Sequence, residues 1–323
     1  MEQNQAYQIY DLKTLSPEER RKVENKRENL YAQVKALKPE HKHDSGNTQK
    51  RYYSSVRQAC KFFADNFNTQ KFKNITAKQF KAAAAYWKDN CSPNTLRTNL
   101  SALRCYCELV GNTHRLPEND ELFLTKRNST EFNRAWLPHE IEQAIKVAEQ
   151  TKRDDIKDAL ELGKLFGMRV SEVCKLKLST LRLALGYSGP TIKGKGGRVR
   201  YVPIETDEQR ALIRRLYSKA KRRGFMDDDL VISRNVKYGP LRQQESIENW
   251  VLNHRHKFTD PNRQSVPTDN GKPRSEKITF HGLRHYYAQE RRQRLTDAGD
   301  PRAKKKLTEG MGHGRLSILE VYT

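Results

Sequence analysis

The sequence of 323 residues has few cysteines and no long apolar run. The cysteines are odd in number and scattered through apolar helical patterns, at Cys60, Cys91, Cys105, Cys107 and Cys174. This distribution argues against a disulfide framework and favours a reducing compartment. Cys105 and Cys107 lack the spacing of a zinc site, and no second pair follows them. Because no apolar run approaches the roughly 20 residues that span a bilayer, we expect no membrane association.

Acidic residues are scarce relative to basic ones. The chain has 39 Asp and Glu against 62 Lys and Arg, which gives a net charge of +23 and a pI near 9.8. Such a field attracts polyanions, of which nucleic acid is the commonest in cells. From charge alone, a solubilising surface or binding to anionic lipid or ribosomal RNA are the alternatives. The first residues lack a basic region followed by an apolar core, so we expect no secretory signal and a cytoplasmic location.

The first part of the chain divides into an arm, a helical domain and a linker. Residues 1–47 are charged and contain one helix-like run, which is a solvated helix, a disordered arm or a segment that docks on DNA or a partner protomer. From residue 48, apolar residues recur at steps of three and four, and Thr76 and Ser92 provide helix caps. We expect a helical domain over residues 48–112 and a polar linker over residues 113–135.

A larger domain is expected over residues 136–323. Helical periodicity predicts helices over residues 139–149 and 154–166, the second ended by Gly167. Strand signals occur only in this part, at residues 181–185, 191–192 and 199–204. A glycine-rich turn separates the last two and favours a hairpin, and residues 258–276 are predicted to form a long polar loop. The predicted fold class is mainly α with a small β-sheet (α+β).

This second domain contains arginines suited to phosphate chemistry. Metal-free phosphodiester transfer needs a nucleophile in line, positive charge at two non-bridging oxygens and a proton for the departing oxygen. Planar guanidinium groups suit the second task, and Arg169 and Arg284 are the candidates, although a single arginine is more often an ordinary surface residue. Glu172 follows Arg169 at a spacing that places both on one helical face, where it could orient the guanidinium.

Two histidines flank the second arginine. His281 precedes Arg284 by three residues, so both could address one phosphate, with His281 accepting a proton or holding an oxygen. His285 raises the alternative of a zinc site. We discount it because Gly282 stands where a His-Glu-x-x-His site has its glutamate, and no third ligand is recognisable. A structural role for His285 is favoured over a supporting catalytic one.

The remaining candidates lie in a glycine-rich turn and near the end of the chain. Lys195 could protonate a departing 5′ oxygen, and Lys193 is the competing candidate. His313 could donate a hydrogen bond to a phosphate oxygen. Tyr322 could attack phosphorus, provided that a base or a strongly positive site helps it lose its proton. A terminal tyrosine packed on its domain is the commoner case.

Each of these motifs is weak alone, but their order and spacing resemble the tyrosine recombinase (phage integrase) family. The matching motifs are Gly-x-Arg-x-Ser-Glu at 167–172, Gly-Lys-Gly at 194–196 before Val202-Pro203, His-x-x-Arg-His at 281–285, and Gly312-His313 with Tyr322 nine residues on. The resemblance covers residues from about 136 to the end and implies a helical core-binding domain ahead of them, to which residues 48–112 are similar.

The resemblance implies a site and an assembly. The residues implied around the scissile phosphate are Arg169, Lys195, His281, Arg284 and His313, with Glu172 and His285 in support. Tyr322 would form a 3′-phosphotyrosyl bond, without metal, ATP or other cofactor. The implied partners are double-stranded DNA with a specific recombination site, three further protomers in a tetramer on two DNA sites passing through a Holliday junction, and DNA-bending proteins as candidate accessories. A bacterium, phage or mobile element is the implied source.

Two departures and two alternatives accompany this interpretation. Residues 318–320, Ile-Leu-Glu, stand where many members have small polar residues, and the chain stops at Thr323 where many continue into a tail that docks on a neighbour. Assembly would then use other surfaces, or the chain is shortened.

Two alternative functions remain. One is a type IB topoisomerase, which cleaves and reseals one strand without a partner duplex, and the other is a non-catalytic DNA-binding protein. A non-catalytic DNA-binding protein would explain the positive charge, but not why six candidate catalytic residues occur in the order of the family's motifs.

Overall fold

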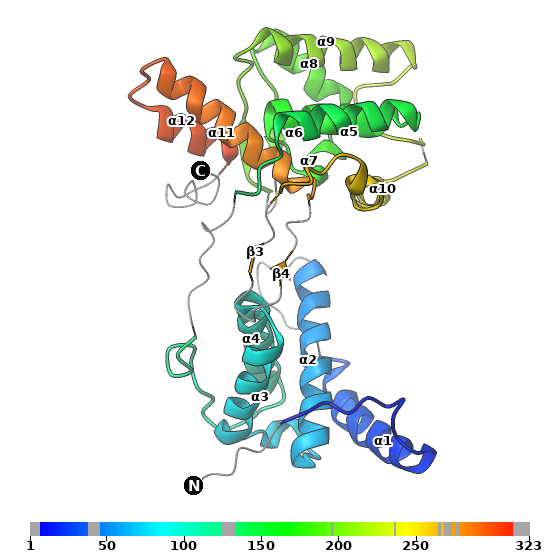
Figure 1. The fold of residues 1–323 in the computed structure, drawn as a ribbon, viewed down its shortest axis with the longest axis vertical. Coiled ribbons are helices and arrows are strands. Elements are labelled where there is room, and N and C mark those ends of the chain that lie inside the picture. Colours follow the sequence, from blue (N-terminus) through cyan, green and yellow to red (C-terminus); the bar gives the residue numbers. More distant parts are fainter. Residues whose placement is uncertain are drawn as a thin grey trace. The chain divides into compact units, whose positions relative to one another are not determined.

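The computed structural model describes residues 7–37, 46–124, 133–194, 197–235, 237–263, 266–267, 273–274 and 278–312, with main chain only at 47, 266–267 and 273–274. These residues form two compact units, one from residues up to 124 and the other from residue 133 onward (Figure 1). Helices dominate both units, and the described strands all belong to the second. The predicted class, mainly α with a small β-sheet, is confirmed. None of the described helices is both long and apolar enough to cross a membrane.

The N-terminal unit consists of helices and short connections. Its elements are α1 (Pro17–Val34), α2 (Gly46–Phe67), the 3-10 turn η1 (Phe72–Asn74), α3 (Ala77–Asn90) and α4 (Pro93–Leu109). The hydroxyls of Ser16, Thr76 and Ser92 accept hydrogen bonds from main-chain N–H groups three residues on, which satisfies donors that a helix start leaves unpaired. The predicted starts at Thr76 and Ser92 are therefore confirmed.

Helix α1 packs against α2 and shares its hydrophobic core. Leu30 and Val34 are fully buried in the same cluster as the apolar face of α2. The Arg27 guanidinium reaches across to the Asp65 carboxylate of α2, with N–O distances of 2.9 and 2.5 Å. Breaking a buried pair of this kind leaves an uncompensated charge. Residues 17–34, for which the sequence left three possibilities open, are thus an integral part of the N-terminal unit.

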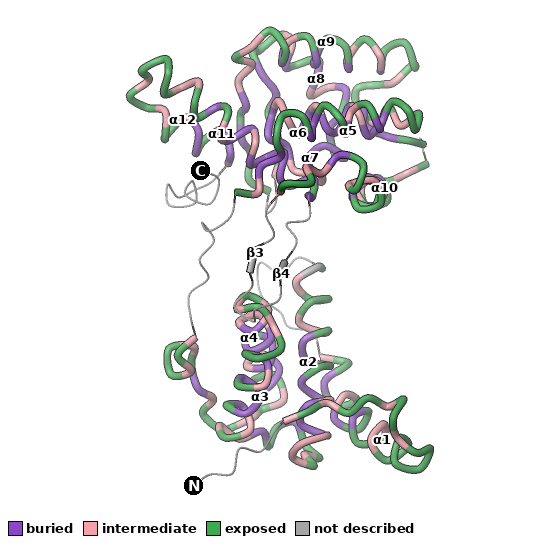
Figure 2. The backbone as a smooth tube through the Cα atoms, in the orientation of Figure 1, coloured by how far each residue is buried: buried purple, intermediate pink, exposed green. Residues whose placement is uncertain are grey.

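The C-terminal unit adds one hairpin to a helical core. Its elements are α5 (Pro138–Gln150), α6 (Asp154–Phe166), α7 (Val170–Val173), α8 (Leu178–Gly186), β1 (Thr191–Lys193), β2 (Val199–Tyr201), α9 (Asp207–Arg222), α10 (Pro240–His254), the 3-10 turn η3 (Arg255–Lys257), β3 (Val266–Pro267), β4 (Pro273–Arg274), α11 (His281–Asp297) and α12 (Ala303–Met311). Strands β1 and β2 pair antiparallel, with Ile192 opposite Arg200, and β3 pairs with β4. The buried sides of α6 and α11 pack against each other (Figure 2).

One predicted strand is wrong, and the predicted hairpin is confirmed. Residues 181–185 lie in α8, not in a strand. Leucines at two-residue steps suggested alternation, but the structure buries Leu181 and Ala184, three residues apart, and leaves Leu183 47% exposed. A short apolar run does not distinguish strand from helix by its period. The β1–β2 hairpin forms as predicted, although β2 ends at Tyr201. The 3-10 turn η3 ends at Lys257, directly before the predicted loop over residues 258–276, and the short pair β3–β4 forms within that loop.

Gly167 ends α6 in the left-handed conformation, with φ of 56°. A Cβ atom at this position would lie 2.3 Å from Cδ1 of Tyr287, whereas Gly224, with φ of 76°, has nothing within 4 Å of such an atom. We expect Gly224→Ala to lower the free energy of unfolding by about 1–2 kcal/mol, the cost of the left-handed conformation alone. Gly167→Ala should cost about 2 kcal/mol more, because the Tyr287 ring must be displaced.

Urea-induced unfolding followed by tryptophan fluorescence measures both losses in the full chain. Gly224→Ala is the matched control, since it shares the backbone strain but lacks the ring contact. Equal losses in the two variants would show that the Tyr287 ring does not constrain this turn.

Candidate active site

The Gly167 turn leads directly into the first arginine of the site. Arg169 precedes α7 as its N-terminal cap, and Glu172 occupies the third position of that helix. The Glu172 carboxylate accepts a hydrogen bond from the main-chain N of Arg169 through Oε2 and from Nη1 of Arg169 through Oε1, each at 2.8 Å. The Glu172 side chain is 1% exposed and that of Arg169 is 28% exposed. The structure therefore brings the two together and leaves part of Arg169 accessible from solvent.

Arg284 lies beneath the same turn. Its side chain comes from the first turn of α11 and is fully buried. Nη1 donates to the carbonyl oxygen of Gly167 at 2.6 Å, and Nη2 donates to the carbonyl oxygen of Met311 at the end of α12. In this arrangement Arg284 joins the turn before Arg169 to α12, and its charge acts on Glu172, the carboxylate that Arg169 contacts.

His281 and His285 lie one helical turn apart on α11, with ring centroids 5.2 Å apart. Partial burial, and then the positive charges of Arg284, Arg169 and Arg134, lower the pKa of His281 to about 4, although part of its surface is exposed. Burial, followed by the neighbouring His281, lowers the pKa of His285 to about 3. Both imidazoles are therefore neutral near pH 7. A neutral, partly exposed His281 can accept a proton.

A buried arginine on the hairpin completes this cluster, and the sequence did not single it out. Arg200 of β2 donates through Nη2 to Oε2 of Glu172 at 2.8 Å and to the carbonyl oxygen of Gly167 at 3.3 Å. Burial alone would raise the pKa of Glu172, but the charge of Arg200 and the hydrogen bonds from Arg169 and Arg200 hold it below its usual value. Glu172 is thus a carboxylate shared by two arginines.

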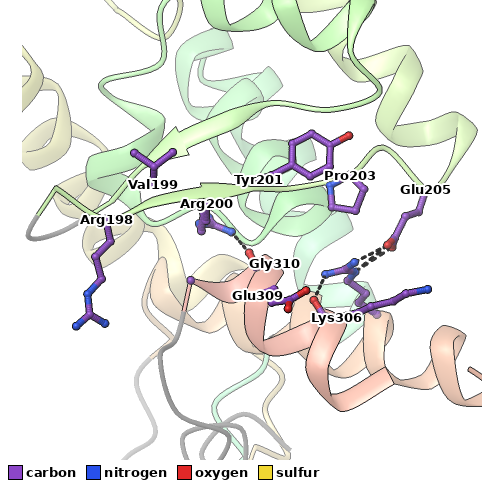
Figure 3. A pocket seen from close by; sticks show the side chains of 11 residues that line it. Arg198, Val199, Arg200, Tyr201, Pro203, Glu205, Lys306, Glu309 and Gly310 are labelled. Carbon is purple, nitrogen blue, oxygen red and sulfur yellow. Dashed lines mark hydrogen bonds and ion pairs between the residues drawn. The ribbon is translucent and has the colours of Figure 1, made fainter. Parts of the chain in front are cut away.

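The end of α12 depends on the same cations. The last carbonyls of a helix lack partners within the helix and carry partial negative charge. Arg200 donates through Nη1 to Gly310 (Figure 3), and Arg284 to Met311. A Cβ at Gly310 would lie 2.1 Å from Nη1 of Arg291, and one at Gly312 would lie 2.8 Å from Cδ of Arg200. Glycine at these two positions gives buried guanidinium groups room at the helix end.

An open pocket of about 810 Å³ lies beside this helix end, between β2 and α12 (Figure 3). Charged residues of both signs line it, including Arg198, Glu205, Lys306 and Glu309. Arg291, at its inner wall, is paired with Glu205 at 2.5 Å and with the carbonyl oxygen of Lys306 at 3.0 Å. The pocket therefore has its own ion pair, separate from Glu172.

Three candidates, Lys195, His313 and Tyr322, lie outside the described residues. The described neighbours of two of them, Lys195 and His313, lie at the cluster. A Cβ at Gly194, which directly precedes Lys195, would be 3.0 Å from Oε1 of Glu172 and 3.7 Å from Nη1 of Arg169. Gly312, which directly precedes His313, packs against Arg200 as described above. The competing Lys193 is exposed at the end of β1.

No group of three or more His, Cys, Asp or Glu side chains that could hold a metal ion occurs in the part of the chain that the structure describes. The charges that meet at this site are those of arginines, balanced by one buried carboxylate.

The chain is similar to known proteins over most of its length. It is 26% identical over 283 residues to tyrosine recombinase XerC of Natranaerobius thermophilus, covering 84% of this chain and 86% of that protein. Its fold is similar to that of a lambda integrase tetramer bound to a Holliday junction, with a TM-score of 0.59 and 17% identity over 90% of this chain and 74% of that one. It is also similar to the XerH recombinase bound to its difH substrate, with a TM-score of 0.56 and 15% identity over 98% and 96% of the two chains.

The model of the phage integrase family matches residues 135–323, more than half of the chain. This range contains the whole cluster described above. The resemblance drawn from the order of the sequence motifs is thereby confirmed. The chain belongs to the phage integrase family, the tyrosine recombinases, which are enzymes that cleave and rejoin DNA.

Proposed function

We propose that this chain is a site-specific recombinase that cleaves DNA through a 3′-phosphotyrosyl intermediate and integrates or excises a mobile element. The observation that carries the proposal is the placement of Arg169. A buried carboxylate holds its guanidinium while part of the side chain stays accessible, beside a neutral histidine and the glycine that precedes Lys195. Such a site offers positive charge and a proton acceptor to a phosphodiester, which are the elements of metal-free transesterification.

In the proposed reaction, Tyr322 is the nucleophile. Its phenolic oxygen forms a bond to phosphorus while the bond from phosphorus to the 5′ oxygen breaks. The phenolic proton passes to His281, which is neutral because its pKa is lowered. Lys195 gives a proton to the departing 5′ oxygen, so that a 5′ hydroxyl is released. Rejoining is the reverse reaction with a 5′ hydroxyl of another strand.

The proposed roles of the other residues concern charge. Arg169 and His313 donate hydrogen bonds to the non-bridging oxygens. Arg284 acts from the buried side of the site, where two of its hydrogen bonds go to carbonyl oxygens and its charge is felt strongly in a poorly solvated interior. Glu172 and His285 support these groups from buried positions.

The proposed partner is double-stranded DNA carrying a specific recombination site. A net charge of +23 supports binding to a polyanion, and lambda integrase and XerH are similar in fold and were solved with DNA. We propose a tetramer on two DNA sites, as the lambda integrase structure shows for that protein, with DNA-bending proteins as candidate accessories. Residues 48–112 would form the core-binding domain and residues 136–323 the catalytic one, in a DNA-associated cytoplasmic protein of a bacterium, phage or mobile element.

Tyr322→Phe should bind DNA as the unsubstituted chain does and form no covalent complex, because the hydroxyl is lost while the charges that bind phosphates remain. Denaturant-resistant adducts on a nicked target, from which the short cleaved fragment diffuses away, measure the covalent step. Adducts that persist in the Phe variant would remove Tyr322 as the nucleophile. Relaxation of supercoiled DNA by a monomer, without strand exchange, would point instead to a topoisomerase.

The role of His281 predicts an unusual pH dependence. A histidine with its ordinary pKa of about 6.5 would lose its ability to accept a proton as the pH falls through that value, whereas a pKa of about 4 keeps His281 neutral well below it. We expect single-turnover cleavage to show no acid limb with a midpoint near pH 6.5. The profile is measured on a substrate with sulfur at the bridging 5′ position, because a thiolate leaves without a proton. The rate on that substrate therefore does not depend on protonation of Lys195. A limb near pH 6.5 that disappears in His281→Asn would contradict this assignment.

A further inference from the structure

Arg200 joins three described segments next to the proposed site, namely α7, the Gly167 turn and the end of α12. Its guanidinium donates to Glu172 of α7, to the carbonyl oxygen of Gly167 in the turn before Arg169, and to Gly310 at the end of α12. It extends from the inner face of the hairpin, and its side chain is 3% exposed. No DNA phosphate can reach so deeply buried a group in this arrangement, so any effect on the reaction must pass through its partners.

The partner that matters most is Glu172. Its Oε2 accepts from Nη2 of Arg200 and from the main-chain N of Arg169, and its Oε1 accepts from Nη1 of Arg169, all at 2.8 Å. Among the described residues, this last contact is the single hydrogen bond of the Arg169 side chain. A carboxylate next to an arginine otherwise tends to pair with it through both oxygens. Arg200, together with the main-chain N of Arg169, occupies the second oxygen and so prevents that pairing.

We propose that Arg200 is a positioning residue, which holds Glu172 in one-oxygen contact with Arg169 so that the remaining N–H groups of Arg169 are available to the non-bridging oxygens of the scissile phosphate. This inference rests on the proposed transesterification. Arginine suits the position because its planar fork reaches three acceptors in different segments at once, which the single ammonium of lysine does not do in fixed directions.

The structure supplies a matched control in Arg291. It is also a buried arginine, it also donates to a main-chain carbonyl of α12, and it pairs with a carboxylate, Glu205. Within the described residues, Arg291 forms no hydrogen bond or ion pair with Glu172 or Gly167. Loss of Arg291 should therefore reproduce the effect of removing a buried arginine near α12 without disturbing Arg169.

The test compares three synthetic substrates in single-turnover cleavage by the full chain. The first carries an ordinary scissile phosphate, the second a methylphosphonate, in which a methyl group replaces one non-bridging oxygen and removes the negative charge, and the third sulfur at the bridging 5′ position. A variant that mispositions Arg169 should recover on the methylphosphonate, because less charge must be stabilised there. A variant that misplaces Lys195 should recover on the sulfur substrate instead.

We expect Arg200→Met to slow cleavage of the phosphate by about 10²-fold, the size of effect that small displacements of catalytic groups produce, with little change in DNA affinity. Most of this loss should disappear on the methylphosphonate and remain on the sulfur substrate, as for Arg169→Ala. Arg200→Lys should show the same preference with a smaller loss. Arg291→Met should show no preference among the substrates.

The ratio of rates on two substrates does not depend on the fraction of protein that is folded, so the comparison survives a loss of stability. Equal losses of Arg200→Met and Arg200→Lys on all three substrates, no loss at all, or recovery on sulfur alone would each overturn the proposal. Failure of the proposed function is distinguishable, because the unsubstituted chain would then form no Tyr322-dependent adduct on any substrate.

Discussion

Glu172 accepts hydrogen bonds from two arginines at once, and the geometry of the candidate site depends on this shared carboxylate. It is buried, so its charge is tolerated only because Arg169 and Arg200 surround it. Because the carboxylate is shared, it also determines which N–H groups of each arginine are left to bind other partners. Arg200 donates its hydrogen bonds to groups inside the protein, whereas part of the Arg169 side chain is exposed at the surface. One buried anion thus pairs with a buried cation, Arg200, and with a partly exposed one, Arg169.

The main chain is adapted to the same cations. The left-handed turn at Gly167 directs its carbonyl oxygen toward Arg284 and Arg200 while the Tyr287 ring packs against it. The carbonyl oxygens at the end of α12 accept hydrogen bonds from the same two arginines. The absence of a Cβ at Gly312 leaves space for Arg200, and its absence at Gly310 leaves space for Arg291. The segments that lead into Arg169 and His313 are therefore joined through guanidinium groups. A change at any one of these points is expected to affect the others.

Much of this arrangement could be predicted from the sequence. The helix starts at Thr76 and Ser92, the end of α6 at Gly167 and the hairpin each follow from local chemistry, and the family followed from the order of the motifs. The roles of individual site residues stay predictions, and Lys195, His313 and Tyr322 lie outside the described residues. The strand predicted over residues 181–185 failed because its leucines fit a period of two as well as the helix that forms.

The sequence did not single out Arg200, because its burial reverses the usual pattern of a half-buried strand. In a half-buried strand the apolar residues normally face the core, yet Val199 is 64% exposed, Tyr201 is 46% exposed and the arginine between them is buried. Its partner, Glu172, is 28 residues away in the sequence, and only the folded chain brings them together. An arginine flanked by apolar residues in a predicted hairpin strand is the signal that could have indicated a buried arginine.

The most direct test of the central claim is a double-mutant cycle between Arg200→Met and Glu172→Gln, measured as the single-turnover rate of DNA cleavage. If the two residues act on Arg169 through one shared contact, their effects are not additive, and the double variant should cleave about as fast as the slower single variant. Losses that simply multiply would show that Arg200 and Glu172 act independently, and would contradict the account.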